Sequence, residues 1–315
     1  MGPTACGKSK LAVDLAERLN CEIVSVDSVL VYRGMDIGTS KPTVEERRGI
    51  PHHLIDILDQ AEVFSTGRFR RLALELIRSI RKRGKTPLLV GGTMLYFKVL
   101  VDGLARLPEA DPEIRAEIER GAASAGWRKM HAQLAQVDPC AAARIHPNDP
   151  QRIQRALEVF RITGRSLTDL CGTEIIENQP FFPIKLKVVP AARQSLHRRI
   201  AVRFRGMVDS GLLEEVEKMV RRGDLNPSCP SVRAVGYRQV WSYLNGEIDR
   251  ESMIERAIAA TRQLAKRQLT WLRKESESFL YDMESRDLAA LISSDVETLM
   301  RQSNQTYYQF GYERR

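Results

Sequence analysis

The residues best suited to chemistry stand at the start of the chain and fit the pattern G-x-x-x-x-G-K-[ST]: Gly2, Pro3, Thr4, Ala5, Cys6, Gly7, Lys8 and Ser9. This is the pattern of a P-loop, whose glycines let backbone N–H groups turn toward phosphate oxygens while the lysine adds a positive charge. The Ser9 hydroxyl can hold Mg²⁺, which makes Mg²⁺ the expected cofactor. The loop therefore predicts a site for a pyrophosphate or a longer phosphate chain.

A helix must follow this loop to position it. Leu11, Leu15 and Leu19 share one face of a helix over residues 9–19. The positive end of the dipole of that helix would point at the bound phosphates, which favours anion binding.

Asp27 is the second candidate for chemistry, because it directly follows a short apolar strand at residues 22–26. A carboxylate at this strand end can bind Mg²⁺ through water or accept a proton from a substrate. The alternative interpretation is a cap of the turn.

A second apolar strand, at residues 87–90, ends in Gly91, Gly92 and Thr93. Many phosphotransferases carry an acidic residue at this place, and its absence argues against ATP hydrolysis. The glycine pair indicates either a close approach of the backbone to a ligand or a tight turn. Thr93 adds a hydroxyl to the same strand end.

The order of the expected elements indicates an α/β fold. Strands are expected at residues 22–26, 87–90, 184–189 and 279–281. Polar residues that follow the strands suit a parallel sheet, where ligands bind beyond the carboxyl ends. Helices around this sheet are expected at residues 65–83, 196–210, 212–222, 233–244 and 251–274. We thus expect a P-loop NTPase-like parallel sheet flanked by helices.

A stretch with helical character only interrupts this alternation, at residues 112–121, 138–145 and 150–163. We interpret it as an all-helical insertion domain over residues 109–178, between a first part of the catalytic core at 1–108 and a second part at 179–285. A C-terminal helix and tail occupy 286–315, and no stable structure is expected from Ser303 onward.

The start of the chain departs from the usual P-loop arrangement, because only Met1 precedes Gly2. A strand normally feeds a P-loop, and a missing central strand would leave neighbouring backbone groups unpaired. We therefore expect the natural reading frame to begin upstream of Met1 and to supply an apolar strand there.

Composition limits the function classes. The formal net charge of +9 raises the question of a polyanionic partner such as nucleic acid. No apolar run is long enough for a membrane helix, so we expect no membrane partner. The five cysteines lack any C-x-x-C spacing, which argues against a disulfide framework or zinc site and favours a reducing cytoplasm.

A basic stripe is expected on the long helix at 251–274. Its apolar face carries Ile258, Ala265, Leu269 and Leu272, which leaves Arg262, Lys266, Thr270 and Arg273 on the opposite side. Other helical arginines, including Arg152, Arg155 and Arg203, are expected to lack matching acids nearby. A groove for a phosphate backbone and an ordinary solvated face explain this pattern equally well.

Six segments taken together resemble one known family. They are the P-loop and residues 27–42, 91–97, 146–152, 235–239 and 266–273. In this order they resemble the bacterial tRNA dimethylallyltransferases, also called tRNA isopentenyltransferases or the IPP transferase family, over nearly the whole chain.

The resemblance implies that the P-loop holds the pyrophosphate of dimethylallyl diphosphate, not ATP. The implied acceptor is N6 of adenosine 37 in tRNAs that read codons beginning with U, and the products are N6-(dimethylallyl)adenosine and diphosphate. Asp27 matches the base of the family, and Thr4, Lys8 and Arg203 match groups that stabilise the departing diphosphate, with Mg²⁺ on Ser9.

The resemblance also implies that the helical insertion grips the anticodon stem, and we expect the enzyme to be a monomer. The implied tRNA contacts are Asp27, Ser28, Val29, Leu30, Thr93, Arg115, Gln151, Arg152, Ile153, Gln154, Arg155, Arg233, Ala234, Val235, Gly236, Tyr237, Arg238, Lys266, Arg267, Gln268, Leu269, Thr270, Trp271, Leu272 and Arg273.

Three other functions stay open at this point. A related enzyme could prenylate free AMP, ADP or ATP, although a free nucleotide does not need the helical insertion and the basic stripe. A P-loop kinase could use Arg152 and Arg155 as lid arginines. A non-catalytic RNA-binding protein is disfavoured by the intact Lys8, Ser9 and Asp27.

Overall fold

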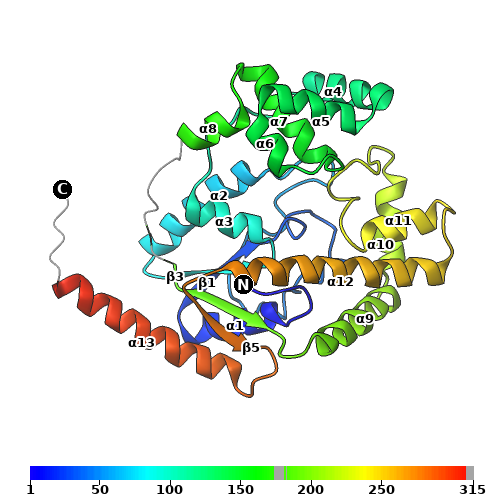
Figure 1. The fold of residues 1–315 in the computed structure, drawn as a ribbon. Coiled ribbons are helices and arrows are strands. Elements are labelled where there is room, and N and C mark those ends of the chain that lie inside the picture. Colours follow the sequence, from blue (N-terminus) through cyan, green and yellow to red (C-terminus); the bar gives the residue numbers. More distant parts are fainter. Residues whose placement is uncertain (174–180, 182, 310–315) are drawn as a thin grey trace. The chain divides into compact units, whose positions relative to one another are not determined.

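The computed structural model describes residues 1–173, 181 and 183–309 (Figure 1). It divides into two compact units, one formed by Met1–Leu100 with Phe182–Arg315 and the other by Val101–Phe181. The predicted insertion at 109–178 falls within the second unit, and its residues 174–178 lie outside the described part, as does the tail after residue 309.

The first unit contains a parallel sheet in the order β2-β1-β3. Strand β1 (Cys21–Val26) pairs with β3 (Thr86–Gly91) from Cys21 opposite Thr86 to Val26 opposite Gly91, and with the short β2 (His52–His53) on its other side. All six residues of β1 are buried, as expected for a strand covered on both faces. The predicted α/β class with a parallel sheet is confirmed.

A second, two-stranded parallel sheet in the same unit consists of β4 (Lys185–Val189) and β5 (Ser278–Asp282). All four strands expected from the sequence are therefore present. In the described residues the two sheets share no ladder. Met1 lies beside β4, since its amino group donates to Leu186 O at 2.8 Å and its carbonyl oxygen accepts from Val188 N at 2.9 Å. The expectation of an upstream strand stays a prediction.

The helices of the first unit surround these sheets: α1 (Lys8–Arg18), α2 (Thr66–Lys82), α3 (Met94–Asp102), α9 (Arg193–Asp209), α10 (Leu212–Arg221), α11 (Tyr237–Leu244), α12 (Arg250–Lys274) and α13 (Leu288–Gln309). Figure 1 shows α12 running alongside α9. Helix α3 continues to Asp102, just inside the second unit. It was not predicted, because its sequence is apolar on all sides and has no helical period.

Two predicted boundaries are wrong. The helix expected from residue 233 begins at Tyr237, because Gly236 has a φ of 96°, which ends regular helical geometry before it. The chain after Ser303 was expected to lack stable structure, yet α13 continues to Gln309. This helix packs against α1.

The second unit is all-helical: α4 (Pro112–Ala125), α5 (Trp127–Val137), α6 (Pro139–Arg144), α7 (Pro150–Thr163) and α8 (Leu167–Thr173). Asp111, Asp138 and Asp149 cap α4, α6 and α7 with their side chains, each followed by a proline in the first turn. Its core is a separate apolar cluster: Ile118, Ala122, Met130, Leu134, Ala141, Ala142, Ile153, Ala156 and Leu157. In the described part of the chain, no helix combines the length and apolarity needed to cross a bilayer.

A buried carboxylate ties the β2-β1-β3 sheet together. The Glu22 side chain on β1 is 4% exposed and contacts His53 Nε2 at 2.7 Å, Arg83 Nη2 at 2.6 Å and Lys85 Nζ at 3.4 Å. The hydrogen bond from Arg83 is the main cause that lowers the pKa of Glu22 from 4.5 to about 2. The charged form of Glu22 therefore stabilises the fold.

We expect Glu22→Gln to lower the free energy of unfolding by on the order of 2 kcal/mol at pH 7. Because the folded-state pKa lies below the unfolded one, this contribution is fully present above pH 4.5 and is lost as the pH falls toward 2. Urea unfolding at pH 7 and pH 3 should show a difference between wild type and variant that shrinks at the lower pH. The control is Glu75→Gln, whose carboxylate is 55% exposed and pairs with Arg71 on the same helix; it should change stability by less than about 0.5 kcal/mol.

Candidate active site

The P-loop turns through two left-handed residues before it enters α1. Ala5 has a φ of 62° and Gly7 a φ of 84°, and Lys8 is the first residue of the helix. The first N–H groups of a helix have no partner within it, so they face the space in front of the loop as donors for an anion. Ser9 lies in the first helical turn and is exposed.

Lys8 folds back over its own loop. Its Nζ donates to Pro3 O and lies 3.7 Å from Cys6 Sγ. Cys6 is 4% exposed, so the thiol belongs to the packing beneath the loop. The lysine charge is therefore held at the loop itself.

Helix α9 brings Arg203 to the P-loop. Arg203 Nη1 lies 3.3 Å from Thr4 Oγ1, while Nε donates to Ser40 Oγ at 2.9 Å and Nη2 to Thr39 O at 3.3 Å. Burial lowers the pKa of Arg203, and the negative charge of Asp27 opposes this effect. Thr4, Arg203 and Asp27, which are far apart in sequence, therefore lie in one neighbourhood.

Asp27 follows β1 and also caps the turn after it. Its Oδ1 accepts from Val29 N at 2.8 Å and Leu30 N at 3.3 Å. The turn-cap interpretation is thus correct for this oxygen, and no hydrogen bond from a described residue reaches Oδ2. One oxygen fixes the direction of the carboxylate, and the other is left for chemistry.

The glycine pair after β3 makes room for protein groups. A Cβ on Gly91 would stand 1.9 Å from Val26 O, and one on Gly92 would stand 2.4 Å from Gln268 Nε2. In the described structure these glycines make room for the neighbouring strand and for a side chain of α12. Thr93, the next residue, donates its N–H to Val26 O at 3.3 Å.

Gln268 on α12 holds the P-loop against this turn. Its Oε1 accepts from Thr4 N at 2.8 Å, and its Nε2 donates to Gly92 O at 2.8 Å. Gln268 is 9% exposed, and Leu272 on the same face is 2% exposed. The family resemblance implied that both side chains contact tRNA. The structure corrects this, because both face the protein interior.

The opposite face of α12 carries the basic stripe. Its exposed side chains are Arg262, Lys266, Arg267, Thr270, Trp271 and Arg273. Within the described residues none of its cations forms an ion pair. On α11 and the loop before it, Arg233 and Arg238 are also exposed, whereas Ala234 and Tyr237 are buried. Ala234 and the Tyr237 side chain are therefore not accessible to tRNA, although the resemblance implied contacts at both.

In the second unit, the arginines expected to lack acidic partners have them. The buried Glu158 accepts from Arg115 Nε at 2.8 Å and from Arg155 Nη1 at 2.7 Å. Arg152 lies 3.4 Å from Asp149. Ile153, also among the implied tRNA contacts, is a core residue with no exposure, so its side chain contacts no ligand. Glu158 fixes the direction of two cations at the start of α4 and on α7.

Comparison with known proteins identifies the family of the chain. The model of the IPP transferase family matches residues 30–275. The chain is 63% identical over 278 residues to a tRNA dimethylallyltransferase of Methylococcus capsulatus, covering 88% of the chain and 89% of the relative. It is 52% identical over 313 residues to one of Ralstonia pickettii, covering 97% of the chain and 96% of the relative.

Solved structures of similar proteins support the same family. A tRNA isopentenylpyrophosphate transferase of Bacillus halodurans is 39% identical with a TM-score of 0.72, covering 98% of this chain and 97% of that one. A eukaryotic dimethylallyltransferase acting on tRNA is 26% identical with a TM-score of 0.77, covering 99% of this chain and 79% of that one. The chain belongs to the IPP transferase family.

Proposed function

We propose that this protein is a prenyltransferase that moves the dimethylallyl group from dimethylallyl diphosphate to N6 of adenosine 37 in tRNAs reading codons that begin with U. The products are N6-(dimethylallyl)adenosine and diphosphate. The observation that carries the proposal is the meeting of Thr4 and Arg203 at the P-loop, with Asp27 in electrostatic range of the same guanidinium. The relatives named tRNA dimethylallyltransferase support the same reaction.

Asp27 acts as the general base in this proposal. An exocyclic amine is a poor nucleophile, because its lone pair is delocalised into the purine ring. As N6 forms its bond to the allylic carbon and the bond from that carbon to the diphosphate oxygen breaks, Asp27 accepts the N6 proton. The cap by Val29 and Leu30 N–H holds the carboxylate for this transfer.

The diphosphate that leaves is stabilised by the loop. In this proposal, Lys8, the hydroxyl of Thr4, Arg203 and the N–H groups at the start of α1 stabilise the charge that develops on it. Among the described residues, no group of three or more His, Cys, Asp or Glu side chains is placed to hold a metal ion. When bound, Mg²⁺ would be held by the exposed Ser9 hydroxyl and the diphosphate oxygens, and it would supply further charge neutralisation.

The tRNA would contact the basic stripe on α12. Lys266, Arg267 and Arg273, which form no ion pair with a described residue, suit phosphates, and the 42% exposed Trp271 beside them offers an aromatic face for a base. The target adenine must leave the anticodon stack to reach Asp27. We further propose that the helical unit grips the anticodon stem, and that the enzyme acts as a monomer in the cytoplasm.

Prenylation of a free nucleotide is the second candidate, and acceptor choice separates the two. Labelled dimethylallyl diphosphate offered with unmodified tRNA, AMP or ATP should label only the tRNA. Label on AMP or ATP alone would assign the chain to nucleotide prenylation, and ATP turnover without the prenyl donor would assign it to a kinase.

We expect Asp27→Asn to lower kcat by on the order of 10²-fold or more, because the amide cannot accept the N6 proton. The variant keeps an oxygen for the Val29 and Leu30 N–H groups, so tRNA affinity should stay within about twofold. Single-turnover transfer and filter binding measure the two quantities. Asp14→Asn on α1 is the matched control and should turn over normally; near-normal turnover of Asp27→Asn would reject the base assignment.

We expect the double variant Lys266→Ala, Arg273→Ala to bind tRNA more weakly and with a shallower salt dependence. The slope of log Kd against log salt should fall by about one unit for each phosphate that the variant no longer neutralises. Lys8→Ala should instead impair use of the diphosphate at unchanged tRNA affinity. The control is Arg78→Ala with Lys82→Ala, which removes the same charge from exposed positions on α2. Equal slopes for the two double variants would mean that the stripe is only a solvated face.

A further inference from the structure

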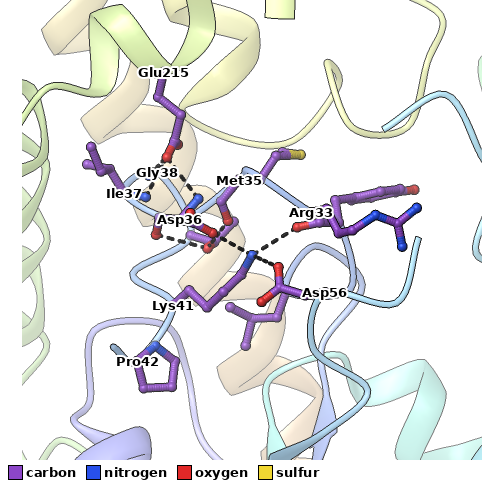
Figure 2. A network of polar contacts seen from close by, with 12 residues as sticks. Arg33, Met35, Asp36, Ile37, Gly38, Lys41, Pro42, Asp56 and Glu215 are labelled. Carbon is purple, nitrogen blue, oxygen red and sulfur yellow. Dashed lines mark hydrogen bonds and ion pairs between the residues drawn. The ribbon is translucent and has the colours of Figure 1, made fainter. Parts of the chain in front are cut away.

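A loop over residues 36–40 is held by a single buried carboxylate. Glu215 on α10 accepts from Asp36 N and Ile37 N at 2.8 Å through Oε2, and from Gly38 N at 3.1 Å through Oε1 (Figure 2). Tyr237 completes the set, with its hydroxyl 2.5 Å from Oε1. Glu215 is 9% exposed.

Lys41, which directly follows this loop, also helps to fix it. The 8% exposed Lys41 donates from Nζ to Tyr32 O at 2.9 Å, to Asp36 Oδ1 at 2.6 Å and to Asp56 Oδ1. Figure 2 shows the Lys41 ammonium group between Asp36 and Asp56. The loop is thus held by two side chains, with Lys41 acting through charge and Glu215 through backbone N–H groups.

Gly38 allows the loop to pack closely against α10 and α11. A Cβ on Gly38 would stand 2.5 Å from the Tyr237 ring and 2.8 Å from Leu212. The loop therefore packs flat against α10 and α11, with its N–H groups aimed at the carboxylate.

The two residues after Gly38 contact Arg203, the arginine that α9 brings to the P-loop. Thr39 O and Ser40 Oγ are two acceptors of the Arg203 guanidinium, whose third described contact is Thr4 Oγ1. Glu215 is therefore linked to Arg203 and Thr4 by hydrogen bonds at both ends of a short stretch of loop backbone. Among the described residues Glu215 forms no ion pair, so its charge is balanced by the loop N–H groups and by Tyr237.

We propose that Glu215 is a positioning residue for the diphosphate site, which aims Arg203 at the departing diphosphate by fixing Thr39 and Ser40. The inference rests on the proposed function, because it takes the P-loop ligand to be a diphosphate. A carboxylate suits the task, since two oxygens accept several N–H donors at once and each such bond is stronger than one to a neutral acceptor. In Glu215→Gln one oxygen becomes an NH₂ group, which would face an N–H of the loop.

The experiment measures the affinity of the folded protein for inorganic pyrophosphate with Mg²⁺ by calorimetry, which requires no prenyl transfer. Glu215→Gln should weaken binding about 10-fold, or about 1.4 kcal/mol, while tRNA affinity stays within about twofold. The matched control is Glu214→Gln, an exposed carboxylate one position earlier on α10, which should bind pyrophosphate like the wild type.

An Arg203→Lys background separates positioning from a general loss of structure. If Glu215 acts through Arg203, adding Glu215→Gln to Arg203→Lys should lower the pyrophosphate affinity by less than about twofold, because the guanidinium that Glu215 positions is already gone. A full 10-fold loss in that background would overturn the proposal, as would unchanged pyrophosphate affinity in Glu215→Gln alone.

Ser40→Ala is a second variant, which tests the link from the loop to Arg203 even if Glu215→Gln does not fold. Ser40 is exposed, and its replacement removes one Arg203 contact while leaving the Glu215 bonds in place. Pyrophosphate affinity should fall about threefold in this variant, and wild-type affinity would reject the link to Arg203. Should the wild type bind pyrophosphate but transfer no dimethylallyl group to tRNA, the proposed function fails while the positioning role is still decided by these affinities.

Discussion

The site depends on one guanidinium that joins segments remote in sequence. Arg203 lies 199 residues from Thr4 and 163 residues from Ser40 along the chain, yet it contacts both. A partly buried cation of this kind is stable only when acceptors surround it, because desolvation opposes its charge. Its three contacts and the nearby Asp27 supply that compensation. One charge therefore links three segments: helix α9, which carries Arg203, and the P-loop and the loop at residues 36–40, which supply its acceptors.

Helix α12 serves two tasks through its two faces. The buried face presents Gln268, whose amide spans from the P-loop to Gly92, and the exposed face presents the basic stripe. A 25-residue helix is stiff on this length scale. The element proposed to contact tRNA is thus also the element that sets the position of the diphosphate loop. In the proposed function, one face of α12 would contact tRNA while the other supports the loop that binds the diphosphate.

Local patterns predicted much of this structure, and tertiary contacts explain what they missed. The P-loop, the four longer strands and the exposure of Lys266 and Arg273 followed from spacing and periodicity. The meeting of Thr4 with Arg203 came only from the family resemblance, since no local signal joins positions so distant.

Strand β2 was missed because its two histidines gain strand geometry from pairing with β1. The role of the Gly91–Gly92 pair stayed open, because a sequence cannot distinguish close approach by a ligand from close approach by Val26 and Gln268. Glu215 was missed, and Gln268 was assigned to tRNA instead of to the P-loop, although a signal existed: each is a polar residue on the apolar face of its helix. A polar group in such a place must find hydrogen-bond partners when the helix packs, but the pattern does not identify the partner segment.

The contact between Gly38 and the Tyr237 ring has a consequence for protein engineering. A methyl group at position 38 would overlap the ring, and a smaller residue at 237 would leave a void beneath the loop. Chimeras between family members that differ at position 38 or 237 must therefore take both positions from the same parent. In such a pair, a crossover between the two positions would leave the loop at residues 36–40 without this support.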